Sequence, residues 1–220
     1  MVDEYLSERE QAEQLRNWLR ENWLWLVGGI VLGLGIVYGY RWWNAHQAER
    51  SEAAEQQFAT MLEALDRNQR EEGLQIAASI AGEYGDTPYA DQTRLVLARL
   101  DIEAGEFDKA AATLKQVMDS TRDPDLALVA RLRLARVLLA KGSYDEALAT
   151  LDAVKCAAIG ARVAELRGDV LAARGQAADA LLAYRQAESA AKAGNATGGL
   201  VDQELLQLKI DELSATSAAN

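Results

Sequence analysis

Hydrophobic residues follow two patterns along this chain: one continuous apolar run near the N-terminus, and amphipathic segments of helical period after it. The run is NWLWLVGGIVLGLGIVYGYRWWN, residues 22–44, and it includes 18 successive residues without a charge, from Trp23 to Tyr40. At about 1.5 Å of rise per residue, a helix of that length covers roughly 27 Å, and the hydrocarbon core of a bilayer is about 30 Å thick. The run therefore predicts a transmembrane helix over residues 23–43.

Tryptophan and tyrosine lie at both ends of the run, as they do in the two headgroup zones of a membrane. They are Trp23 and Trp25 at one end and Tyr38, Tyr40, Trp42 and Trp43 at the other. The 22 residues before Trp23 include six acidic residues, whereas a signal peptide has a short basic leader. We interpret the run as an uncleaved span. The flanking arginines, three before it and two after it, favour a cytoplasmic N-terminus only weakly.

Three later segments repeat one pattern of small and large residues. They are LVLARLDIEAGEFDKAAATLKQV (95–117), LRLARVLLAKGSYDEALATLDAV (132–154) and ELRGDVLAARGQAADALLAYRQA (165–187). Since glycine tolerates the left-handed conformation that ends a helix, Gly105, Gly142 and Gly175 predict the turns of three helical hairpins. Their spacings, 37 and 33 residues, lie close to the period of about 34 in a tetratricopeptide repeat.

The helical pattern continues on both sides of these repeats. Large apolar residues predict an earlier hairpin, with helices around residues 58–65 and 74–81. Because glycine and proline are absent between residues 40 and 70, we expect the membrane helix to run on into that hairpin. At the other end, GNATGG (194–199) predicts a loop, and residues 200–210 predict a last amphipathic helix that caps the array.

Composition agrees with an all-α fold, because alanine is abundant, there are two prolines, and no segment alternates as a strand does. We therefore predict a single N-terminal transmembrane helix followed by a tetratricopeptide-like helical-hairpin solenoid with a C-terminal capping helix. The third hairpin is expected to be less regular, because Arg167 and Ala177 replace the leucine and the aromatic residue of the other two. The net charge of −11 repels phosphate groups and argues against nucleic-acid binding.

No combination of residues is typical of catalysis or metal binding. His46 is the only histidine and Cys156 the only cysteine, so we expect neither a zinc site, nor a disulfide, nor a catalytic triad. We interpret His46 as a bystander in the headgroup zone and Cys156 as a small apolar filler on a helix face, with a reactive thiol as the alternative. The prediction is a protein that is not an enzyme and has no cofactor, metal ion or small-molecule substrate; a cryptic carboxylate site is the competing reading.

Two features predict interactions with other proteins. The span contains two small-residue stripes, Gly29 with Gly33 and Gly35 with Gly39, which let a second helix approach closely in lipid. The first helices of the hairpins predict a concave peptide-binding groove of apolar and charged residues. By position in the repeat its residues are Leu95, Arg99, Ile102, Leu132, Arg136, Leu139, Arg162, Glu165 and Asp169. Burial of some of them between repeats is the alternative.

The layout as a whole resembles a known family. An acidic tail of about 20 residues, a Trp-flanked span and a hairpin array ending in LLQLKIDEL (205–213) are similar to the bacterial inner-membrane proteins described as ancillary subunits of the SecYEG translocon. The segment ARGQAADALLAYRQA (173–187), preceded by Arg167-Gly168-Asp169, carries most of the resemblance.

The resemblance implies a location and partners that periodicity alone does not give. Residues 1–22 would be a cytoplasmic acidic tail, 23–43 the span in the inner membrane, and 44–220 a periplasmic domain. The implied partners are the SecYEG translocon and a periplasmic chaperone or folding factor that receives newly translocated proteins. The alternative is a tetratricopeptide scaffold for another envelope complex, in cell division or outer-membrane assembly.

Overall fold

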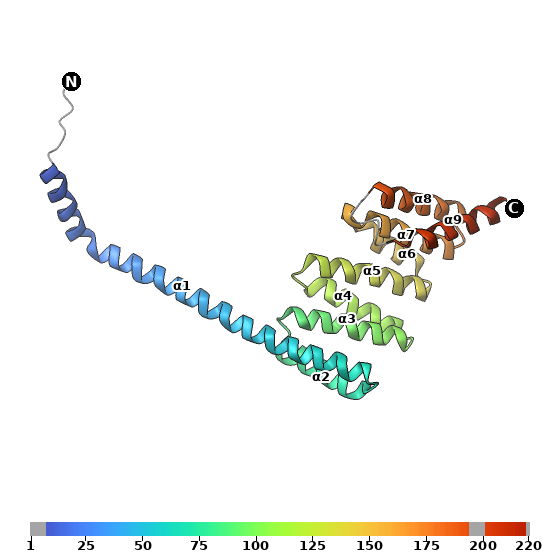
Figure 1. Cartoon of the computed structure of the whole chain (residues 1–220), viewed down its shortest axis with the longest axis horizontal. Coiled ribbons are helices and arrows are strands. Elements are labelled where there is room, and N and C mark those ends of the chain that lie inside the picture. The colour runs from blue at the N-terminus through green and yellow to red at the C-terminus, as the bar shows by residue number, and fades with distance from the viewer. Residues whose placement is uncertain (1–7, 194–200, 219–220) are drawn as a thin grey trace, which may run out of the picture. The chain divides into compact units, whose positions relative to one another are not determined.

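The computed structural model describes residues 8–193 and 201–218, and in these residues helices are present and strands are absent, which confirms the all-α class. The helices are α1 (Glu8–Asp66), α2 (Arg70–Glu83), α3 (Pro88–Glu103), α4 (Phe107–Ser120), α5 (Pro124–Lys141), α6 (Tyr144–Asp152), α7 (Gly160–Ala173), α8 (Ala177–Ala193) and α9 (Gln203–Ala218), with a short 3-10 helix η1 (Ala157–Ile159) before α7 (Figure 1). The chain divides into two compact units, Met1–Ala53 and Ala54–Asn220.

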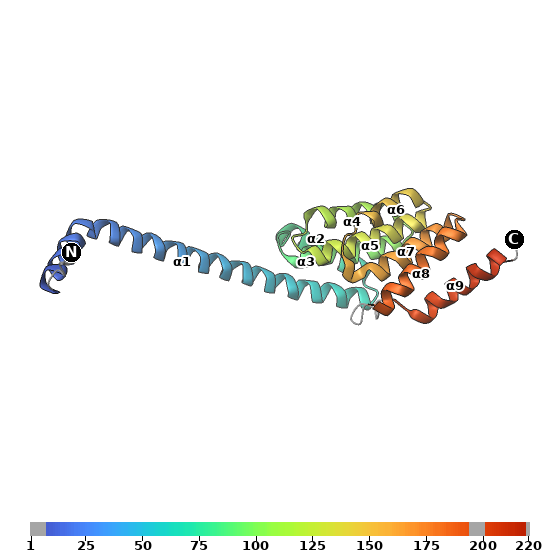
Figure 2. The same cartoon turned by 90° about the horizontal axis from the view of Figure 1, so that it is seen from above.

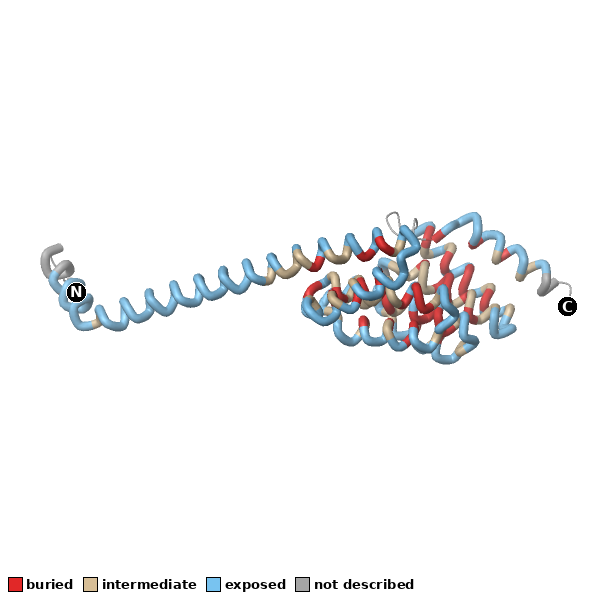
Figure 3. The backbone as a smooth tube through the Cα atoms, turned by 90° about the horizontal axis from the view of Figure 1, so that it is seen from below, coloured by how far each residue is buried: buried red, intermediate tan, exposed pale blue. Residues whose placement is uncertain are grey.

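Helix α1 is 59 residues long and contains the whole apolar run. It continues without a break to Asp66, as the lack of glycine and proline after Tyr40 predicts. Among the described residues, it is the helix that is long and apolar enough to cross a membrane. The apolar side chains of residues 23–43 have no protein cover: Trp25 is 83% exposed, and Figure 3 shows this part of the helix as exposed. An uncovered apolar helix fits a lipid-facing segment and not the core helix of a soluble domain.

The second unit is a stack of helical hairpins. The end of α1 packs on α2 through Met61, Ala77 and Ile80, and α3 pairs with α4, α5 with α6, and α7 with α8. Figure 2 shows α2, α4 and α6 along one side of the stack and α3, α5 and α7 along the other. This is the arrangement that the sequence repeats predict.

The three predicted glycine turns have one geometry. Gly105, Gly142 and Gly175 have φ of +77°, +81° and +86°, a left-handed region that residues with a Cβ avoid. In each turn the residue after the glycine donates its N–H to the carbonyl oxygen five positions back, at 2.8 to 2.9 Å. This bond closes the end of the first helix. The third hairpin, expected to be less regular, therefore has the same turn as the other two.

Alanines at the repeated small positions let the paired helices approach each other. Ala98 and Ala135 on the first helices, and Ala110, Ala147 and Ala180 on the second, are all fully buried. Larger residues such as Leu114 and Leu151 fill the space between neighbouring hairpins. The buried residues form one cluster that runs from α3 to α7 and two smaller ones, where the end of α1 meets α2 and α3 and where α7, α8 and α9 meet. Figure 3 shows buried positions throughout the stack.

The structure corrects two local predictions. Helix α9 spans Gln203–Ala218 and not residues 200–210, because the Asp202 carboxylate accepts hydrogen bonds from the N–H groups of Glu204 and Leu205 and so caps the first turn. The predicted loop at 194–199 lies outside the described residues. The interpretation of Cys156 as filler on a helix face is wrong: α6 ends at Asp152, which leaves Cys156 exposed in the connection to η1.

Candidate functional site

The best candidate for a binding site is a pocket between α5 and the start of α7. Its volume is about 340 Å³, and its lining combines apolar side chains with three arginines. The lining residues are Leu128, Val129, Leu132, Arg133, Arg136, Ile159 and Arg162. A cavity of roughly 300 Å³ is at the small end of protein ligand sites.

Helix α5 supplies most of the pocket because of its spacing. Val129, Arg133 and Arg136 lie at i, i+4 and i+7, which places them along one face of the helix. Leu132 lies beside them, partly buried, and packs against the core of the stack. Val129 at the rim is 40% exposed. The pocket therefore has an apolar floor anchored in the core and a positively charged edge.

The three arginines of the pocket differ in their partners. Arg162 forms an ion pair with Glu165, with 2.8 Å between Nη1 and Oε2. In the part of the chain that the structure describes, Arg133 and Arg136 have no carboxylate within ion-pairing distance. Partial burial lowers the pKa of Arg136, and the neighbouring charge of Arg162 lowers it further, although the side chain still reaches solvent. The nearby carboxylates of Glu165 and Asp169 act in the opposite direction without forming an ion pair with Arg136.

The structure brings three of the nine predicted groove residues together, namely Leu132, Arg136 and Arg162, at this pocket. Leu95 is 6% exposed and lies in the core, and Ile102 and Leu139 pack partly buried against the same core. Arg99 is exposed and pairs with Glu103 at 3.2 Å.

Four residues of the pocket are absent from the predicted groove: Leu128, Val129, Arg133 and Ile159. The predicted groove includes one position per helical turn of α5, whereas the pocket also includes neighbouring positions on the same face. The succession ALVARLRLAR (127–136), in which arginines alternate with apolar residues, was the signal available. Ile159 had no such signal, because it comes from η1 in the connection.

The last two predicted residues, Glu165 and Asp169, belong to a polar cluster that joins α7, α8 and α9. Lys209 Nζ lies 3.0 Å from Glu165 Oε1 and 2.7 Å from Asp169 Oδ1, and it lies 5.5 Å from the centre of the Tyr184 ring. The Tyr184 hydroxyl donates to Asp169 Oδ1 at 2.8 Å. Glu165 is buried, and with its two cationic partners it is fully paired.

The electrostatics of this cluster favour a structural role. Burial disfavours the charge on Lys209, but its hydrogen bonds to Asp169 and Glu165 outweigh that cost, and the pKa of Lys209 is raised. Burial and the bond to Asp169 also raise the pKa of Tyr184, which therefore stays protonated and donates. The cluster holds α9 against α7 by satisfied charges.

The described residues contain no group of three His, Cys, Asp or Glu side chains that could hold a metal ion. His46 stacks on Trp42, with 5.8 Å between the ring centres. The four glycines of the span, Gly29, Gly33, Gly35 and Gly39, have no atom within 4 Å of the place a Cβ would take, apart from their own helix backbone, so this stripe is uncovered.

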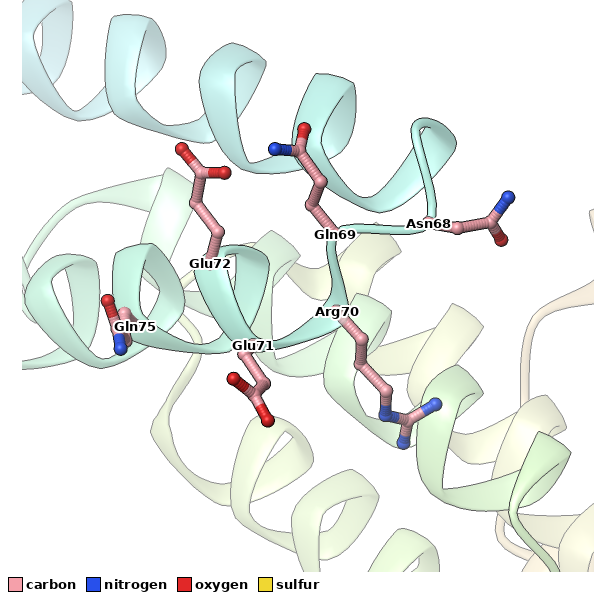
Figure 4. Close-up of a pocket in the computed structure, with 6 residues that line it drawn as sticks. All are labelled: Asn68, Gln69, Arg70, Glu71, Glu72 and Gln75. Atoms are coloured by element: carbon pink, nitrogen blue, oxygen red, sulfur yellow. The ribbon is translucent and has the colours of Figure 1, made fainter.

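A second pocket, at the turn between α1 and α2, is a weaker candidate. Its lining is polar: Asn68, Gln69, Arg70, Glu71, Glu72 and Gln75. Figure 4 shows that these side chains point in different directions and do not converge on one point. Arg70 reaches back toward the carbonyl oxygen of Leu100 at 3.5 Å.

Comparison with known proteins identifies the family. Residues 16–215 match a family model described as "Tetratricopeptide repeat-like domain". The chain belongs to this family. The match includes the apolar helix as well as every helical hairpin.

Curated relatives cover nearly the whole chain. An Escherichia coli (strain K12) protein named "Ancillary SecYEG translocon subunit" is 34% identical over 210 residues, covering 96% of this chain and 98% of that protein. A Haemophilus influenzae protein of the same name is 29% identical over 208 residues, covering 94% of this chain and 98% of that protein. The resemblance inferred from the sequence is therefore confirmed.

Among solved structures, MamA from Desulfovibrio magneticus has a similar fold. Its TM-score is 0.52, with 19% sequence identity, and the alignment covers 76% of this chain and 96% of that one. At this identity the likeness concerns the fold alone.

Proposed function

We propose that this protein is a membrane-anchored ancillary subunit of the SecYEG translocon. The observation that carries the proposal is the 34% identity to a protein of that name over 96% of the chain. The similarity extends over both units, so it concerns the anchored protein and not a repeat domain alone. Tetratricopeptide repeats are widespread, and a match confined to them would say little about a partner.

The proposed layout follows the sequence. Residues 1–22 lie in the cytoplasm, 23–43 cross the inner membrane, and 44–220 form the periplasmic domain. The uncovered apolar helix with aromatic residues at both ends supports the crossing. The glycine stripe offers a face on which a helix of the translocon packs, because small residues allow close approach in lipid.

In the periplasm the hairpin domain assists newly translocated proteins together with a periplasmic chaperone or folding factor. It acts by binding and not by catalysis: its strongest candidate site is a pocket with an apolar floor, large enough for one or two side chains of a peptide. Its charged cluster between α7 and α9 is paired internally and supports the fold.

Affinity purification of the full chain in a mild detergent tests the partner. We expect the translocon channel to be recovered with the protein from native membranes. The matched control keeps both flanks and replaces residues 23–43 with an unrelated single span, which separates recovery through the span from recovery through the domain. Recovery of division or outer-membrane assembly proteins in place of the translocon would contradict the proposal.

A further inference from the structure

Arg133 and Arg136 of the α5–α7 pocket form no ion pair within the described residues, and several other exposed cations, such as Arg185, are likewise unpaired. Acidic residues outnumber basic ones by 34 to 23, so carboxylates are in excess. Neighbouring cations use that excess: Arg99 pairs with Glu103, Arg94 with Asp91, and Arg174 with Asp145.

Arg136 is the member of this pair whose position partly desolvates the guanidinium, although both residues are exposed. Partial burial lowers the pKa of Arg136, and the Arg162 charge beside it has the same effect. A cation that the protein desolvates without a partner gains more from a bound carboxylate than an exposed cation does, since the desolvation has already taken place.

The apolar part of the pocket restricts which carboxylate fits. The pocket has an apolar surface next to its charged edge, formed by Leu128, Leu132 and Ile159, and Val129 lies at the rim. A volume of about 340 Å³ holds one or two aliphatic side chains. A hydrated small anion leaves this surface uncovered, and a purely apolar segment leaves Arg136 unpaired.

We propose that this pocket binds an extended peptide segment in which an aspartate or glutamate stands next to leucine, isoleucine or valine. The carboxylate pairs with Arg136 and Arg133, and the aliphatic side chain covers Leu132. This inference rests on the proposed function in one respect, because it specifies which segments of a client or partner the periplasmic domain holds. The narrower site uses α5 and α7 and does not need Leu95 or Arg99.

The test uses the full chain in nanodiscs of neutral lipid and short fluorescent probes. One probe carries Leu-Asp-Leu between Gly-Ser flanks with both ends blocked, and its matched control carries Leu-Asn-Leu, which has the same shape without the charge. Binding is followed by fluorescence anisotropy. We expect the aspartate probe to bind roughly tenfold more tightly than the asparagine probe, as charge-assisted hydrogen bonds add that order of affinity.

Variants assign the difference to the pocket. Arg136→Gln should reduce aspartate-probe binding to the level of the asparagine probe, while the control Arg185→Gln, an exposed arginine of α8 outside the pocket, should leave it unchanged. Arg133→Glu with Arg136→Glu should reverse the preference toward a Leu-Lys-Leu probe. That gain of binding also shows that the variant is folded.

Equal binding of the aspartate and asparagine probes by the native chain overturns the proposal, and so does an equal loss of binding in Arg136→Gln and Arg185→Gln. Recovery of the translocon, measured in parallel, keeps the two proposals distinct. Translocon recovery without selective probe binding rejects the pocket alone, whereas selective binding without translocon recovery rejects the proposed function.

Discussion

Gly168 on α7 lies against the ring of Tyr184 on α8. A Cβ at this position would lie 2.4 Å from Cδ1 of Tyr184, well inside van der Waals contact. The Tyr184 ring has little room to move, because it is buried and its hydroxyl donates to Asp169. The glycine thus allows α7 and α8 to pair around a large aromatic residue.

Gly168→Ala should destabilise the domain by about 1 to 3 kcal/mol, the usual cost of overpacking. Denaturant titration of the full chain in detergent, followed by circular dichroism, measures the change. The control is Gly160→Ala on the same helix, where a Cβ meets no atom within 4 Å and little change is expected. Equal stability of both variants and the native chain would contradict the close packing.

At the scale of elements, α9 depends on Lys209. The amine pairs with Asp169 and Glu165 on α7, and Leu206 and Ile210 beside it enter the core. Removing the cation leaves two carboxylates, one of them buried, with fewer partners. The cost of such a change is typically a few kcal/mol.

Lys209→Met should therefore loosen α9 before the rest of the domain, by about 2 kcal/mol given the partial exposure of the pair. Hydrogen exchange should show faster exchange in residues 203–218 and unchanged protection in α3 and α4. Uniformly faster exchange throughout the array would mean that α9 is not a separately held element.

The pH dependence of the same element follows from the raised pKa of Lys209 and Tyr184. The folded state binds these two protons more tightly than the unfolded state does. Their contribution to the free energy of unfolding is therefore complete below the ordinary pKa values, about 10, and is lost as pH rises above them. Exchange in α9 should accelerate above about pH 10 in the native chain. Lys209→Met should show a smaller acceleration, and an identical profile would rule out the amine as its source.

The elements themselves were largely predictable from the sequence, because their causes are local. Gly105, Gly142 and Gly175 stop a helix wherever the chain folds back, and the absence of glycine and proline after Tyr40 lets α1 continue. Long-range pairs were not predictable. Lys209 pairs with Asp169, which lies 40 residues earlier in the sequence, and only the packing of α9 brings the two side chains together.

The sequence predicted the part of the pocket that depends on local spacing and not the part that depends on long-range packing. Helical periodicity places Leu132 and Arg136 on one face of α5, and repeat alignment adds Arg162. The alignment treats Arg99 and Arg136 alike, whereas Glu103 pairs with the first and no described carboxylate pairs with the second. Equivalent positions in a repeat share geometry but not neighbours.

At the scale of the whole molecule, the proposed orientation can be tested with a native residue. Cys156 is the only cysteine and is exposed, so it reports the side of the membrane on which the domain lies. In intact spheroplasts a membrane-impermeant maleimide should label it, and Cys156→Ser should abolish the label. Ser7→Cys in the Cys156→Ser background should be labelled only after lysis, and the opposite pattern would reverse the topology.

The proposed role at the translocon predicts a pattern of contacts along the transmembrane helix. If the glycine stripe packs against a channel helix, contacts should recur along one face of the helix and be absent from the other. If the span instead pairs with a second copy of itself, the contacts would recur with the same helical period, but the crosslinked product would be a dimer of this chain. The identity of the crosslinked partner therefore decides between these cases.

The most direct measurement is site-specific photocrosslinking in native membranes, with a photoreactive residue placed singly at each position from Val27 to Tyr38. The account predicts adducts with the translocon channel that recur every three to four residues, as on one helical face, centred on Gly33. Adducts only with a second copy of the chain, or with proteins of another envelope complex, would contradict it.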